Sequence, residues 1–163
     1  MKILAIDPGN VYSGYIILDE NFKPLEKGKV ENEEMMKILK EFLKENNQVT
    51  IEMIGCYMMN AGRSVFDTCI FIGRLQQECL NNAVEPFFIE RRYIKLNLCG
   101  KVTANDTAVI HALVERFSYD NLKNHGKGTK KNKGFFYGFA KDMWQAYAVG
   151  VTYLDMKNKH FVI

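Results

Sequence analysis

The first thirty residues constrain the fold more than any other part of the chain. Residues 2–7 (KILAID) and 12–19 (YSGYIILD) are short apolar runs on either side of Pro8 and Gly9, which is the pattern of two strands joined by a tight turn. Residues 25–30 (LEKGKV) alternate apolar and polar side chains, as expected at the solvent-facing edge of an antiparallel sheet. The sequence therefore predicts a hairpin followed directly by a third strand.

The rest of the chain alternates helical and extended patterns. Apolar residues recur at three-to-four spacing over 32–44, which predicts an amphipathic helix, and residues 49–54 (VTIEMI) form a run typical of a central strand covered by helices. Further along we expect a helix over 64–82, a strand over 86–90, no assignable element over 91–100, and helices over 104–117 and 141–154. This order predicts an α/β fold with a mixed five-stranded sheet and helices on both of its faces.

Composition excludes several classes of protein. A chain of 163 residues with 47% hydrophobic and 25% charged residues is expected to form a single globular domain over 1–163. No apolar run approaches the ~20 residues of a membrane span, and MKILAIDPGN is no signal peptide, so we expect a cytoplasmic protein with no membrane partner. The four cysteines form no CxxC pair, which argues against a zinc site. A net charge of +3 is too small to identify a nucleic-acid partner by itself.

Three acidic residues stand where catalytic carboxylates are plausible. Asp7 ends the first strand, although an Asp before Pro-Gly is also an ordinary turn residue. Glu52 lies inside an apolar strand, where burying a carboxylate is costly unless it is paired or bound to a cation; an edge strand with Glu52 in water is the weaker alternative. Asp142 opens the last helix, where an acid also complements the helix dipole. Together they predict a site for Mg²⁺ or Mn²⁺, and two such ions about 4 Å apart can cleave a phosphodiester.

A family resemblance supports this interpretation. LAIDPGNVYSGYIILD resembles the opening strand and hairpin of the RuvC-type Holliday junction resolvases, which are RNase H-like nucleases. VTIEMI is similar to that family's acid-bearing fourth strand, and KDMWQAYAVGVTY is similar to its C-terminal helix, which starts with a DxxD pattern. The resemblance implies an RNase H-like fold, catalytic metal ligands at Asp7, Glu52 and Asp142, two ions per active site, and a homodimer acting on a two-fold symmetric junction.

Further blocks of sequence narrow the resemblance. VFDTCIFIGRL, KLNLCG and KGTKKNKG look most like the RuvC-like proteins of bacteriophages and prophages, which would act in the cytoplasm of a bacterial host. The family's second helix acid falls on Gln145, which could bind the metal ion through its carbonyl oxygen or hold a metal-bound water, with weakened affinity or changed selectivity. Asp106 falls near a position where the family often has a lysine, and a plain helix-start acid is the favoured interpretation.

Basic and aromatic residues are candidates for DNA contact. The lysine-rich loop, residues 121–138, contains glycines, three aromatic residues and four lysines that we predict to bind phosphate: Lys127, Lys130, Lys131 and Lys133. Phe135, Phe136 and Tyr137 offer stacking faces for bases. A solvated surface explains any single lysine better, but we expect the loop as a whole to touch DNA.

Three residues outside this loop complete the DNA-binding prediction. Tyr57 follows Glu52 and is the nearest candidate for an aromatic that wedges into a junction, and Arg63 is a candidate for a phosphate contact. Both could equally be packing residues. Lys95, in the KLNLCG block, is the third candidate.

The predicted function is a divalent-metal-dependent endonuclease that resolves Holliday junctions or other branched DNA in recombination, replication or phage genome processing. Two alternatives keep the same fold: a branched-DNA-binding protein without activity, favoured by Gln145, and an RNase H-type hybrid nuclease. A nucleotide-binding regulator of the actin-like kind is a third, because DPGNVYSG also resembles the phosphate-binding hairpin of those ATPases. Those proteins need two such domains, and this chain has no second glycine-rich hairpin.

Overall fold

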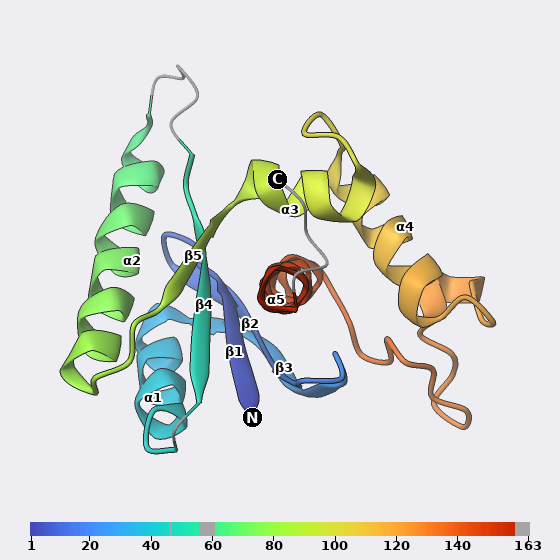
Figure 1. The fold of residues 1–163 in the computed structure, drawn as a ribbon, viewed down its shortest axis with the longest axis horizontal. Helices are drawn as coiled ribbons and strands as arrows, with labels where there is room; N and C mark the ends of the chain where they lie inside the picture. Colours follow the sequence, from blue (N-terminus) through green and yellow to red (C-terminus); the bar gives the residue numbers. More distant parts are fainter. Residues whose placement is uncertain (46, 56–60, 159–163) are drawn as a thin grey trace.

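The computed structural model describes residues 1–45, 47–55 and 61–158, and a five-stranded sheet runs through its centre in the order β3-β2-β1-β4-β5 (Figure 1). The strands are β1 (Lys2–Asp7), β2 (Tyr12–Asp19), β3 (Pro24–Glu31), β4 (Gln48–Met53) and β5 (Phe87–Glu90). The first three pair antiparallel, whereas β4 lies parallel to β1 and β5 parallel to β4. The predicted mixed sheet is therefore confirmed.

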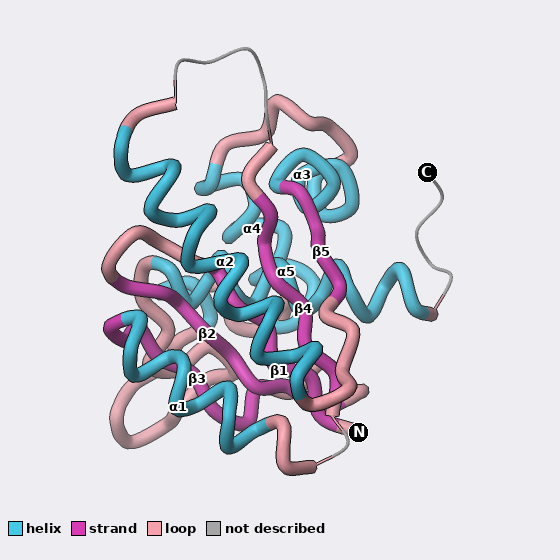
Figure 2. Tube along the Cα trace, turned by 90° about the vertical axis from the view of Figure 1, so that its left-hand side faces the viewer, coloured by secondary structure: helices cyan, strands magenta, loops and turns pink. Residues whose placement is uncertain are grey.

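Helices cover both faces of the sheet. They are α1 (Asn32–Phe42), α2 (Arg63–Asn81), α3 (Arg91–Cys99), α4 (Asp106–Phe117) and α5 (Asp142–Lys157), with a short 3₁₀ turn η1 (Lys123–Gly126). One face packs against α1 and α2, which lie in front of the sheet in Figure 2, and the other packs against α3, α4 and α5. In the part of the chain that the structure describes, no helix has the length and apolar character needed to span a membrane.

The alternation of β1 explains why both faces are covered. Ile3 and Ala5 point into the core beneath α5, while Leu4 and Ile6 point into the core beneath α1 and α2, and all four are fully buried. A strand buried on both faces needs an almost continuous apolar run, which is what residues 3–6 provide. The strand therefore ends at its first acidic residue, on the boundary of the core.

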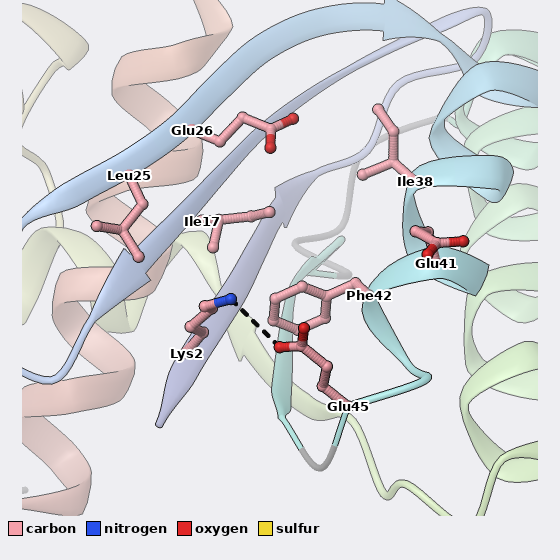
Figure 3. Close-up of a pocket in the computed structure, with 8 residues that line it drawn as sticks. All are labelled: Lys2, Ile17, Leu25, Glu26, Ile38, Glu41, Phe42 and Glu45. Carbon is pink, nitrogen blue, oxygen red and sulfur yellow. Dashed lines mark hydrogen bonds and ion pairs between the residues drawn. The ribbon is translucent and has the colours of Figure 1, made fainter.

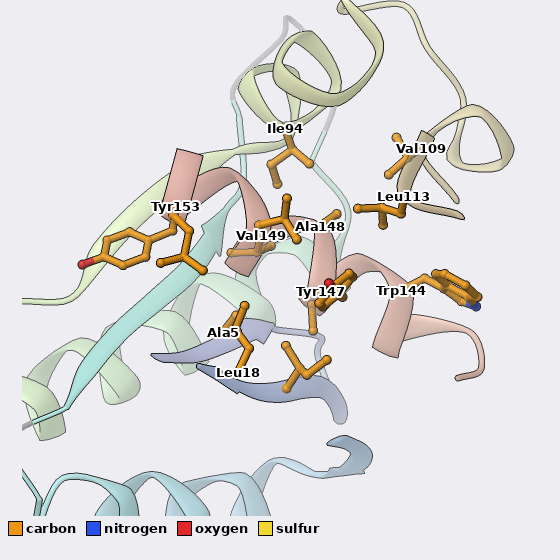
Figure 4. Close-up of a cluster of buried hydrophobic side chains, with 14 of the residues drawn as sticks. Ala5, Leu18, Ile94, Val109, Leu113, Trp144, Tyr147, Ala148, Val149 and Tyr153 are labelled. Carbon is orange, nitrogen blue, oxygen red and sulfur yellow. The ribbon is translucent and has the colours of Figure 1, made fainter. Parts of the chain in front are cut away.

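Helix α5 lies directly on the sheet and is buried from Ala146 to Asp155. Figure 4 shows its side chains between the sheet residues Ala5 and Leu18 and the residues contributed by α3 and α4. Gly150 permits this close packing, because a Cβ there would lie 2.7 Å from a methyl carbon of Leu18 and 3.1 Å from the Cβ of Ala5. The tight packing places the start of α5 at the same end of the sheet as the end of β1.

Candidate active site

Asp7 and Glu52 lie on adjacent parallel strands. Ile6 is opposite Ile51 in the register of β1 and β4, so the next residue of each strand is one of the two acids. Parallel neighbours that are level in register point to the same face of the sheet. The two carboxylates predicted from the sequence are thus brought together at the end where β1 finishes.

Asp142 reaches the same place from α5. Gly14, on β2, is paired with Asp7 on one side and with Lys29 on the other. A Cβ on Gly14 would lie 2.6 Å from the backbone oxygen of Asp142, so only glycine lets the helix start this close to the sheet. We call the four carboxylates at this end, Asp7, Glu52, Asp142 and Asp106, the acid cluster.

The acid cluster raises the pKa of its buried members. The pKa of Asp7 rises to about 8, chiefly because burial disfavours its charged form and next because Glu52 carries a like charge. Asp142 and Asp106 add to this rise, and Arg91 opposes it. Burial also raises the pKa of Glu52, against the lowering effect of Arg91. Positive charge delivered to this end of the sheet would therefore be strongly stabilised.

Two basic side chains of the protein already supply part of that charge. The Nη1 atom of Arg91 lies 3.2 and 3.0 Å from the two oxygens of Glu52, and its Nη2 atom lies 2.7 Å from Oδ1 of Asp106. On the other side of Asp7, the Nζ atom of Lys29 lies 2.6 Å from Oδ2 of Asp142. Basic side chains are thus paired with three of the four carboxylates: Glu52, Asp106 and Asp142.

Gln145 lies one helical turn after Asp142, on the same side of α5. Its Oε1 atom is buried and has no hydrogen-bond partner in the described part of the chain. A buried carbonyl oxygen without a partner is costly, and a hard divalent cation, or a water bound to one, would satisfy it.

The residues at this end therefore fit Mg²⁺ or Mn²⁺, which prefer carboxylate and carbonyl oxygens. Among the described residues no three acidic, histidine or cysteine side chains converge as a ready-made ligand set. Two of the carboxylates are instead paired with basic side chains, Glu52 with Arg91 and Asp142 with Lys29.

The lysine-rich loop is more ordered than its composition indicates. Gly128 pairs with Lys133 as an isolated β-bridge, and the backbone NH of Gly134 donates to the oxygen of Lys127. Lys130, Lys131 and Lys133 are exposed and Lys127 is half-buried. The loop therefore presents most of its charge to solvent from a defined backbone.

The predicted stacking faces are largely wrong. Phe136 is fully buried and packs on Trp144, with 4.7 Å between ring centroids. Phe135 stacks on Phe117 inside the same core. Tyr137 is partly accessible, and the Nζ atom of Lys133 lies 4.9 Å from its ring centroid. These aromatic residues anchor the loop, because apolar rings next to α5 gain more from burial than from exposure.

The other DNA-binding candidates lie in three different settings. Tyr57 falls outside the described residues. Arg63 is the first residue of α2, and its exposed side chain pairs with Asp67, with 3.2 Å between Nε and Oδ1. Lys95 lies on α3 and lines a hollow of about 450 Å³ together with Glu52 and Arg91. Of the two candidates among the described residues, Lys95 is therefore the one placed beside the acid cluster.

Sequence reasoning missed two basic partners of the acids, Arg91 and Lys29, and the ion pair that Asp106 forms with Arg91. Asp106 is indeed a helix-start acid, as expected, but its carboxylate also holds Arg91. The available signal was the basic pair after β5, since a residue following a strand parallel to β4 lies level with the end of β4.

A second hollow, of about 340 Å³, lies at the opposite end of β1 (Figure 3). Apolar side chains from β2, β3 and α1 line it, and the Nζ atom of Lys2 lies 3.2 Å from Oε2 of Glu45 at its edge. No residue of the acid cluster lines it. The predicted site residues therefore lie away from this hollow.

Comparisons with known proteins agree on the fold. No protein-family model and no curated protein matches the chain. A solved structure of Thermus thermophilus RuvC has 14% identity and a TM-score of 0.66, covering 98% of this chain and 97% of its own. T. thermophilus RuvC in complex with a Holliday junction substrate has 15% identity and a TM-score of 0.69, covering 98% and 96%. The chain therefore has the fold of the RuvC-type resolvases.

Proposed function

We propose that this protein is a structure-selective, divalent-metal-dependent endonuclease that resolves Holliday junctions or other branched DNA. The observation that carries the proposal is the meeting of Asp7, Glu52 and Asp142 at one end of the sheet. The solved RuvC structure with a Holliday junction substrate, which shares this fold, supports the choice of DNA. The work of such an enzyme would be recombination, repair or phage genome processing in a bacterial cytoplasm.

Asp7, Glu52 and Asp142 would hold Mg²⁺ or Mn²⁺, and the unpartnered oxygen of Gln145 would serve as a further ligand. Such ions supply Lewis-acid stabilisation to the phosphate and lower the pKa of the attacking water. Because Asp7 and Glu52 extend from strands buried in the core, their carboxylates are held without loop motion. The exposed lysines of the lysine-rich loop would attract the DNA backbone to the protein.

Cleavage of labelled DNA tests this function directly. Four-way, three-way and flap DNA and an RNA:DNA hybrid are incubated with the protein in Mg²⁺, Mn²⁺ or EDTA. We expect cleavage of branched DNA in either metal and none in EDTA. Glu41→Gln, an exposed acid beside the hollow at the opposite end of β1, is the matched control for Glu52→Gln and should cleave normally. Preferential cleavage of the hybrid would instead support an RNase H-type enzyme.

A homodimer follows from the same function, because two strands of a symmetric junction must be cut. The outer face of α2 offers a surface for a second copy: Phe66 and Ile70 are 57% and 65% exposed. Gly73 continues this face, and a Cβ there would meet nothing within 4 Å, so another helix can approach closely. Apolar residues one turn apart on an exposed helix are typical of an interface.

Sedimentation tests the dimer. We expect Phe66→Asp combined with Ile70→Asp to give a monomer, because two buried charges would oppose the interface. Tyr119→Asp is the matched control: its side chain is 79% exposed and lies outside α2, so the dimer should persist. A double variant that sediments like the unaltered protein would contradict the α2 interface.

A DNA-binding protein without activity is the second candidate, and Gln145 is the feature that favours it, since it replaces an acid of the family pattern. This candidate predicts junction binding with no cleavage in any metal. The substrate experiment above separates the two, because binding and cleavage are scored on the same labelled junction.

A further inference from the structure

Arg91 holds two acids of the cluster at once. It opens α3 immediately after β5, and Met53 and Glu90 are opposite each other in register, so Arg91 begins level with the end of β4. One terminal nitrogen contacts both oxygens of Glu52, and the other contacts Asp106. A planar guanidinium suits this two-sided contact, which a lysine ammonium cannot reproduce.

The two acids sit in different environments. The side chain of Glu52 is 14% exposed, whereas that of Asp106 is 60% exposed at the start of α4. Asn105 caps that helix by accepting from the backbone NH of Ala108, which fixes the position of its neighbour Asp106. Asp106 is therefore the outer anchor of Arg91, and Glu52 is its inner partner.

The inner contact conflicts with a bound ion. Nη1 of Arg91 lies within 3.2 Å of both oxygens of Glu52, so a divalent cation on either oxygen would meet a positive charge at short range. Like charges at such a distance in a half-buried place repel strongly. The cation and the guanidinium therefore cannot share Glu52 in the arrangement that the structure shows.

We propose that Arg91 is a resident counter-cation of the acid cluster, a positioning residue that a divalent ion must displace from Glu52 while Asp106 retains it. The inference rests on the proposed metal-dependent function. Glu52 and Arg91 both line the hollow of about 450 Å³, which leaves space next to the guanidinium. Arg92 and Lys95 line the same hollow, so the displaced Arg91 adds to a basic surface that favours a DNA phosphate.

Calorimetric titration of the DNA-free protein with Mg²⁺ at pH 9, where proton competition is weakest, tests the exchange without any cleavage assay. Arg91→Gln removes the competitor, and we expect Mg²⁺ to bind roughly tenfold more tightly. Arg92→Gln is the matched control: it removes the same charge one residue away, from a side chain paired with Glu90 at 3.3 Å. Its affinity should change less than about twofold.

Arg91→Gln leaves Glu52 buried without its partner and could destabilise the fold, so a second variant that keeps the positive charge is measured beside it. Arg91→Lys keeps the charge but cannot hold both acids, so we expect an increase in affinity of about threefold. Thermal unfolding in EDTA and in Mg²⁺ gives an independent readout, and Mg²⁺ should raise the melting temperature of both variants more than that of the unaltered protein.

The outcomes separate the two proposals. If the unaltered protein binds Mg²⁺ and cuts junctions but Arg91→Gln binds equally or more weakly, the exchange is overturned and the proposed function stands. Weaker binding would mean that Arg91 merely supports Glu52. If no protein binds Mg²⁺ at millimolar concentration with or without junction DNA, both the exchange and the proposed metal site are overturned.

Discussion

The acid cluster and the lysine-rich loop carry opposite charges and hold them in opposite ways. Asp7 and Glu52 extend from buried strands, and each is surrounded by named charged partners. Lys130 and Lys131 are exposed, and their ordering comes from the backbone bridge and the buried ring of Phe136 behind them. A buried charge acts through its few neighbours, whereas an exposed charge acts through the sum of many.

We expect the largest effect from a single substitution in the acid cluster. Asp7→Asn keeps the size of the side chain and removes one charge, so we expect junction cleavage to fall by more than about a thousandfold. Junction affinity measured in EDTA should stay within about twofold, because the exposed lysines are unchanged. Near-normal cleavage would show that Asp7 lies outside the active site.

The lysine-rich loop should respond only to combined changes. Replacing Lys127, Lys130, Lys131 and Lys133 by Ala should weaken junction binding by about a hundredfold at low salt and lower the slope of log affinity against log salt by about 3. Lys131→Ala alone serves as the control and should cost about twofold. An unchanged slope in the quadruple variant would mean that these lysines form an ordinary solvated surface and do not bind DNA.

Gln145 lies between these extremes, since it is half-buried and neutral. Gln145→Asp adds an anionic oxygen beside Asp142, so we expect the Mg²⁺ concentration for half-maximal cleavage to fall several-fold. Gln145→Asn, which has the same length as Asp without its charge, is the control. A higher Mg²⁺ requirement for Gln145→Asp would mean that the two carboxylates repel each other with no ion between them.

The smallest effect concerns stability without metal. The pKa of Asp7 is raised to about 8 in the folded protein, so the folded state retains a proton that the unfolded chain releases near pH 4. Stability in EDTA should therefore fall as pH rises from about 5 to 8, by a few degrees in melting temperature. Asp7→Asn should remove this pH dependence, and thermal unfolding from pH 5 to 9 measures it.

The sheet and most helices could be predicted because their periodicity is local. Residues 91–100 gave no prediction because IKLNL alternates apolar and polar side chains, which fits a strand as well as the helix α3 that forms there. The sequence around Phe136 likewise predicted that its ring stacks on DNA bases, because its burial depends on Trp144 and the rest of α5, which are not neighbours in that loop. Local sequence cannot show which side of a ring a distant helix will cover.

The candidate acids were predictable for a related reason. A carboxylate within an apolar strand is conspicuous, and Glu52 required no knowledge of its neighbours. The contact between Arg91 and Glu52 depends on the parallel pairing of β4 with β5. The contact between Lys29 and Asp142 depends on the pairing of β2 with β3, which places Lys29 opposite Gly14. Charges could thus be located from the sequence, but their pairing required the register of the sheet.

The position of α5 has a consequence for synthesis of the protein. Asp7 is translated long before Asp142, yet the two residues come together across Gly14. A growing chain on the ribosome can pair β1 with β2 early, but it lacks the helix that fills the core over both strands. The acid cluster is therefore incomplete until α5 emerges, so a nuclease built this way would stay inert toward DNA during its own translation.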